Sequence, residues 1–122
     1  MICKPAFSIS TAELFHRIDS HSLRTHPDTA GMTEAMEKRD LAGIARRMYN
    51  VFEDALPRSA NEIRTIRGEL LDHGALGAVM TGTGSAVFGL FEDPDRARAA
   101  LADFTPQYRD CCMTTIISEP YY

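Results

Sequence analysis

The stretch VMTGTGSAVFGLF, from Val79 to Phe91, is the feature that most restricts how this chain can fold. Two short apolar runs flank a turn in which Gly82 and Gly84 alternate with hydroxyl side chains. A tight turn between two adjacent strands needs only one or two residues with positive φ, which glycine adopts without strain. We therefore predict two strands joined by this turn, with positive φ at Gly82 or Gly84.

The hydroxyls of Thr81, Thr83 and Ser85 surround the two glycines. Amides and hydroxyls gathered in one turn are suited to face a polar group such as an anion. A glycine-rich hairpin is equally explained by close packing of the backbone. The sequence has neither the lysine of a phosphate-binding P-loop nor a glycine motif that opens a helix, so both nucleotide-binding fingerprints are excluded for this turn.

Apolar periodicity and capping residues on either side of the hairpin give the order of the remaining elements. Ser10, Asp40, Ser59 and Asp93 are the expected helix caps, and Gly74 is an expected helix stop. Strands are expected within 1–5, 75–81, 86–91 and 111–119, and helices within 8–19, 32–40, 41–55, 59–74 and 92–104.

This order of strand, helices, strand, strand, helix and strand predicts an α+β fold. It is an embellished split βαβ, or ferredoxin-like, sandwich: a four-stranded sheet with extra helices in the first crossover. The 122 residues suit one domain, spanning 1–122.

Composition excludes several classes of function. The net charge is −4 and no block of like charge stands out, so neither nucleic-acid nor membrane-surface binding is expected. No apolar run is long enough to span a membrane. Cys3, Cys111 and Cys112 lack metal-ligand spacing and are expected to be reduced thiols of a cytoplasmic protein.

No complete catalytic or metal-binding set is visible in the sequence. Ser85 lacks the G-x-S-x-G context of a nucleophile, so no catalytic residue and no metal ligand is assigned. Asn50 is an amide in an otherwise apolar run. It is expected either to bond backbone near the glycine turn or to lie exposed at the edge of a helix face.

Two stretches, KPAFSISTAELF and YNVFEDAL…IRTIRGELLDHGALGAVMTGTGSAVFGLF, carry a resemblance to a known family. Together they resemble the C-terminal half of the 4-diphosphocytidyl-2-C-methyl-D-erythritol kinases of the GHMP kinase superfamily. The glycine turn is similar to the third motif of that superfamily. The resemblance covers the chain from Ile2 to about Ser118.

The resemblance implies roles for particular residues. Thr11 and Phe15 would border the cytidine pocket of the substrate, with Phe15 in place of the family's commoner tyrosine. The alternative for Phe15 is a core anchor for its helix. Residues of the turn (Thr81, Gly82, Thr83, Gly84 and Ser85) would face the phosphate and substrate side of a cleft.

The resemblance also implies that the complete enzyme uses ATP and Mg²⁺ to phosphorylate the 2-hydroxyl of its substrate in non-mevalonate isoprenoid biosynthesis. Nothing in this sequence matches the family's N-terminal ATP-binding half. The chain is therefore expected to be a truncated or split gene product that is inactive and binds no cofactor alone. Its exposed apolar surface favours weak self-association. The alternatives are a ligand-binding or regulatory module with this fold, and the C-terminal domain of another GHMP kinase.

Overall fold

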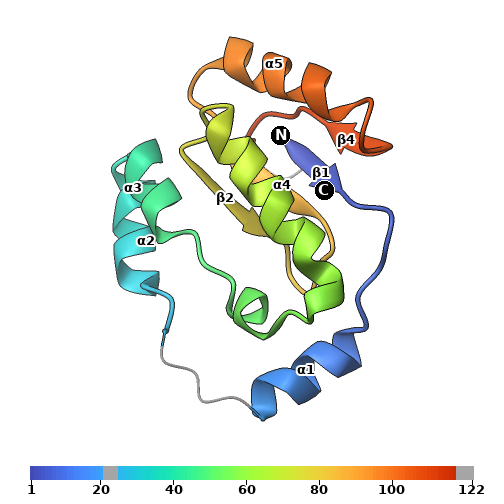
Figure 1. The fold of residues 1–122 in the computed structure, drawn as a ribbon. Helices are drawn as coiled ribbons and strands as arrows, with labels where there is room; N and C mark the ends of the chain where they lie inside the picture. The colour runs from blue at the N-terminus through green and yellow to red at the C-terminus, as the bar shows by residue number, and fades with distance from the viewer. Residues whose placement is uncertain (21–24, 118–122) are drawn as a thin grey trace.

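The computed structural model describes residues 1–20 and 25–117. Its strands and helices follow the predicted order (Figure 1). In chain order they are β1 (Ile2–Lys4), α1 (Thr11–Asp19), α2 (Thr29–Glu37), α3 (Leu41–Arg47), the 3-10 helices η1 (Val51–Ala55) and η2 (Arg58–Ala60), α4 (Asn61–Asp72), β2 (Gly77–Met80), β3 (Val87–Leu90), α5 (Pro94–Phe104) and β4 (Asp110–Cys112).

The four strands form one antiparallel sheet in the order β2-β3-β1-β4. Val79 lies opposite Phe88 across the hairpin, and Cys3 lies between Val87 and Cys111. The first and last strands are thus neighbours in the sheet. This is the ferredoxin-like arrangement predicted from the sequence, with α1, α2, α3, η1 and η2 inserted before α4 in the first crossover.

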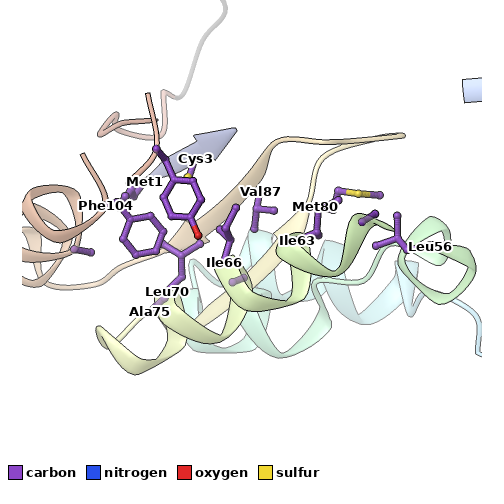
Figure 2. Packing of buried hydrophobic residues seen from close by; sticks show 14 of the residues in the cluster. Met1, Cys3, Leu56, Ile63, Ile66, Leu70, Ala75, Met80, Val87 and Phe104 are labelled. Carbon is purple, nitrogen blue, oxygen red and sulfur yellow. The ribbon is translucent and has the colours of Figure 1, made fainter. Parts of the chain in front are cut away.

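The main core lies between one face of the sheet and helices α4 and α5. Figure 2 shows Ile63, Ile66 and Leu70 of α4 packed toward Val87 and Met80 of the strands. All five side chains are almost completely buried. Because strand side chains alternate between faces, Gly77 and Val79 point to the opposite side of the sheet.

Helix α3 packs on that opposite side, against β2. A Cβ on Gly77 would lie 2.8 Å from the carbonyl oxygen of Ala45, so only glycine allows this approach without a shift of the backbone. In Figure 1, α2 and α3 lie beside β2, whereas α1 lies at the end of the molecule opposite α5.

Several helix boundaries are set by the expected residues. The Ser10 and Asp40 side chains accept hydrogen bonds from the third residue beyond them, at the starts of α1 and α3. Asp93 caps α5, with Pro94 as its first residue. Gly74 has a φ of 96° at the end of α4, as expected of a helix stop.

Other boundaries differ from the prediction. The helix expected over 41–55 ends at Arg47, and the chain continues through an extended segment into η1. Ser59 is not a helix cap, because it lies inside η2 and α4 begins after Ala60 without a side-chain cap. Leu71 of α4 lies outside the core and is 45% exposed. The last strand is shorter than predicted and ends at Cys112.

Candidate functional site

The glycine turn has the backbone geometry that its sequence predicts. Gly82 and Gly84 have φ values of 47° and 86°. The Gly84 N–H donates to the Thr81 carbonyl at 2.8 Å, which closes a β-turn whose first central residue has positive φ. Within the described part of the chain, the N–H groups of Gly82 and Thr83 have no hydrogen-bond partner.

The turn is joined to the segment that leads into α1. The hydroxyls of Thr11 and Thr83 lie 3.0 Å apart in a hydrogen bond. The Ser85 hydroxyl donates to the Phe7 carbonyl at 2.6 Å, and Ser85 is only 1% exposed. Two residues expected at the site, Thr11 and Thr83, are therefore in direct contact although 72 positions separate them. Ser85 instead links the turn to the backbone at Phe7, ahead of α1.

Phe15 is not a buried anchor of α1, because it is 52% exposed. Its ring contacts Phe52 of η1 edge to face, with ring centroids 5.0 Å apart and planes at 78°. Leu14 is the completely buried residue of this helix. Phe15 therefore presents an aromatic surface on the helix that also carries Thr11.

Asn50 holds the turn from the other side. Its side-chain amide donates to the carbonyls of Met80, at 2.8 Å, and Gly82, at 2.7 Å. Its side-chain oxygen accepts from the Phe52 N–H at 3.0 Å and starts η1. Of the two possibilities that the sequence left open for Asn50, bonding to backbone near the glycine turn is confirmed.

An open cavity of about 540 Å³ lies beside the turn, on the face of the sheet opposite α4. Thr81 and Gly82 line it together with Asn50. Apolar side chains from the sheet and the inserted segment form much of its wall, namely Met32, Met48, Phe52, Val79, Met80 and Phe88. Of the expected site residues, Thr81 and Gly82 line this cavity, whereas Thr11 and Phe15 do not and Ser85 is buried.

Charged groups at the cavity were not identified from the sequence. The Arg47 guanidinium lies 3.2 Å from the Asp28 carboxylate. The pKa of Asp28 is lowered by its hydrogen bond from the Gly31 N–H and by Arg47. Tyr49 donates to Asp54, which raises the pKa of this tyrosine to about 12. Asp28 and Arg47 are 19 positions apart, at the start of α2 and in α3, so no local sequence spacing indicates that they meet.

Behind the turn, the Glu53 carboxylate lies 3.2 Å from Arg67 of α4, and its side chain is 10% exposed. Burial raises the pKa of Glu53, and Arg67 opposes that rise. Arg67 also donates to the Ala78 carbonyl at 3.1 Å. This pair ties η1 to α4 and to the strand that enters the turn.

The described residues contain no group of three or more histidine, cysteine or acidic side chains able to hold a metal ion. Nor does any described helix have the length and apolar character needed to cross a bilayer. The arrangement can bind and orient a ligand through amides, hydroxyls and an aromatic ring.

Comparison with known proteins places this geometry in a family. The family model described as "GHMP kinases C terminal" matches residues 32–110, which run from within α2 through α3, α4, the glycine hairpin and α5. This chain belongs to the GHMP kinase C-terminal family.

Individual relatives extend the likeness beyond the residues matched by the GHMP kinase C-terminal model. The chain is 33% identical over 117 residues to a 4-diphosphocytidyl-2-C-methyl-D-erythritol kinase of Clostridium novyi, which covers 96% of the chain and 42% of the kinase. It is 37% identical over 110 residues to the kinase of the same name from Syntrophomonas wolfei, which covers 90% of the chain and 39% of the kinase.

A crystal structure of 4-(cytidine 5'-diphospho)-2C-methyl-D-erythritol kinase superposes on 88% of the chain and 38% of the kinase, with a TM-score of 0.70 and 25% identity. The chain thus spans about two-fifths of the length of the relatives it matches. Within the GHMP kinase C-terminal family, its resemblance to kinases of this name is confirmed.

Proposed function

We propose that this chain is the C-terminal, substrate-binding half of a 4-diphosphocytidyl-2-C-methyl-D-erythritol kinase, a cytoplasmic transferase of isoprenoid biosynthesis. The observation that carries the proposal is the similarity to kinases of this name over up to 96% of the chain. In the complete enzyme, ATP bound with Mg²⁺ supplies the phosphoryl group for the 2-hydroxyl of the substrate.

The residues of this chain bind and orient the substrate. The half-exposed ring of Phe15 is available to stack on the cytosine, and such a base–aromatic contact contributes about 1–3 kcal/mol to binding. Thr11 lies beside it in the same helix and fixes Thr83 of the turn. The surface of α1 that would bind the cytidine and the glycine turn are thereby held at a constant distance from each other.

The glycine turn supplies donors for the phosphate side of the substrate. Gly82 is exposed and a Cβ there would meet no atom within 4 Å, so a ligand can approach its backbone closely. The N–H groups of Gly82 and Thr83 are the donors proposed for this role. Asn50 keeps the turn in position through the Met80 and Gly82 carbonyls.

A chimeric kinase tests this proposal. The 117 matched residues of the Clostridium novyi kinase are replaced by this chain, and ATP-dependent phosphorylation of 4-diphosphocytidyl-2-C-methyl-D-erythritol is measured. We expect protein-dependent turnover, with a higher KM in the chimera that carries Phe15→Ala. The native kinase is the positive control. A chimera that melts cooperatively but transfers no phosphate would favour the alternatives, in which the chain is a ligand-binding module or part of another GHMP kinase.

A further inference from the structure

Two thiols face each other across the first and last strands of the sheet. Cys3 of β1 is the direct partner of Cys111 of β4, and their sulfur atoms lie 3.1 Å apart. Cys3 is completely buried, as Figure 2 shows at one end of the core, and Cys111 is partly buried. Both cysteines are in the thiol form.

The strand register places the two backbones at a distance suited to a disulfide. The Met1 nitrogen donates to the Gly89 carbonyl at 3.0 Å, and the Gly89 N–H donates to the Met1 carbonyl at 2.9 Å. Since such pairs alternate along a strand, the backbone polar groups of Cys3 also point toward β3 and away from β4. Cys3 and Cys111 thus form a non-hydrogen-bonded pair.

Residues in such a pair have Cα atoms about 4.5 Å apart, within the roughly 4.4–6.8 Å that a disulfide requires. Side-chain rotation alone can then bring the sulfur atoms to the bonded distance of about 2.05 Å. Cys112 is the neighbour of Cys111 in the strand, but it pairs with Ile2 and points to the other face. It cannot replace Cys111 as the partner of Cys3.

We propose that Cys3 and Cys111 are an oxidisable pair that a peroxide converts into an intramolecular disulfide. The Cys111 sulfur attacks one peroxide oxygen, the O–O bond breaks, and a sulfenic acid and one water form. The Cys3 sulfur then attacks the Cys111 sulfur, the S–O bond breaks, and the hydroxyl leaves with the Cys3 proton as a second water. Two thiols lose two electrons in total, and one peroxide is reduced.

The disulfide would join strands that are already neighbours, between residues 108 positions apart in the chain. Closing so long a loop restricts the unfolded state strongly, so the oxidised protein should be the more stable form. Burial raises the pKa of both thiols, which keeps them protonated at neutral pH. The pair should therefore respond to sustained oxidant and not to a brief pulse.

The test uses the full chain and its Cys112→Ser variant, which keeps the pair and removes the exposed thiol. Each is treated with hydrogen peroxide, and its mass, melting temperature and tryptic peptides are measured without reductant. In both proteins we expect residues 1–17 to be linked to residues 110–122, with the linked pair lighter by two hydrogens than the two separate peptides. The melting temperature should rise by roughly 5–15 °C and return with dithiothreitol.

The matched control is Cys111→Ser, which should show neither the link nor the rise in melting temperature. The peptide map of the Cys112→Ser protein shows by itself whether Cys3 and Cys111 are linked. The result therefore does not depend on how well the control folds. Added oxygen on Cys111 without a link to Cys3, a disulfide between two chains, or no loss of hydrogen in the Cys112→Ser protein would each overturn the proposal.

Discussion

Phe15 and Phe104 show how differently the fold uses two phenylalanines on amphipathic helices. Phe104 is 1% exposed and packs in the main core, with its ring centroid 5.5 Å from that of Tyr108. Phe15 is 52% exposed and touches Phe52 only by an edge. The difference arises because α5 covers the sheet, whereas α1 lies beyond its end with only Leu14 completely buried (Figure 1).

We expect Phe15→Ala to change the melting temperature little, since the edge contact with Phe52 contributes at most about 1.5 kcal/mol. In the chimeric kinase, the same substitution should weaken binding of cytidine 5'-diphosphate by about 1–3 kcal/mol, measured by calorimetry. Phe104→Ala is the matched control and should cost about 3–5 kcal/mol of stability. A large loss of stability in Phe15→Ala with unchanged nucleotide affinity would contradict the assigned role.

The two turn glycines differ in what a side chain would meet. At Gly84 a Cβ would lie 2.7 Å from the Met80 sulfur and 3.1 Å from Ile9, at a φ of 86°. Gly84→Val should therefore cost at least the 1–3 kcal/mol or so typical of a strained backbone position. Gly82→Ala, in open space, should cost less. Urea unfolding measures the loss of stability in each variant. A larger loss in Gly82→Ala than in Gly84→Val would contradict this prediction.

At the scale of elements, the segment between α3 and α4 departs most from the prediction. Its apolar residues recur with helical spacing, yet the helix ends at Arg47. Met48 and Asn50 adopt extended backbone, and the Asn50 amide reaches two carbonyls of the hairpin. These bonds to the hairpin outweigh the local helical preference, because leaving the carbonyl of the buried Met80 without a partner is costly.

We predict that Asn50→Asp destabilises the protein by about 1–3 kcal/mol, because a carboxylate cannot donate to the Met80 and Gly82 carbonyls. Asn61→Asp is a suitable control, since Asn61 is exposed at the start of α4, where a negative charge is favourable. Thermal or urea unfolding measures both effects. Equal stability of the two variants would show that the Asn50 amide does not hold the turn.

The buried carboxyl of Glu53, which links η1 to α4, should make the stability of the protein depend on pH. Burial raises its pKa above the usual 4.5, so the folded protein keeps a proton that the unfolded chain has already released. The contribution of this carboxyl to stability therefore falls as pH rises from about 4.5 through the raised pKa. Glu53→Gln removes that titration.

The free energy of unfolding of wild-type protein minus that of Glu53→Gln should accordingly decrease as the pH rises above 4.5. Urea unfolding at a series of pH values measures the difference, in which the other carboxyl groups cancel. An increase with pH would mean that the ion pair with Arg67 dominates over burial.

At the scale of the whole molecule, contacts from distant segments of the chain meet at the glycine turn. The contacts of Thr11, Thr83 and Asn50 build one connected surface around the turn. Among the described residues, no acidic or histidine cluster suited to a metal ion accompanies it. A surface of this kind offers backbone N–H groups and hydroxyls that can orient a ligand.

We therefore expect the isolated chain to show no ATP-dependent phosphorylation of 4-diphosphocytidyl-2-C-methyl-D-erythritol. Transfer of labelled phosphate from ATP, measured against a reaction without protein, checks this expectation. The chimeric kinase is the positive control in the same assay. Turnover by the isolated chain that increases with its concentration would contradict the assignment of a substrate-binding half.

The sequence by itself determined the order of the elements, the hairpin and the positive φ of its glycines. It did so because these features depend on residues close together in the chain: the Ser10, Asp40 and Asp93 caps, the Gly74 stop and the alternation around Gly82. It also carried the family resemblance, and it gave bonding to backbone near the turn as one of two possibilities for Asn50.

Only the tertiary structure decided which residues meet across the fold. It ended α3 at Arg47, left Leu71 at the surface, paired Thr11 with Thr83, and brought the Cys3 and Cys111 sulfurs together. Each outcome depends on which distant strand or turn lies opposite a residue. Local spacing cannot specify that, because packing and hydrogen bonding to distant partners override helical preference where the two conflict.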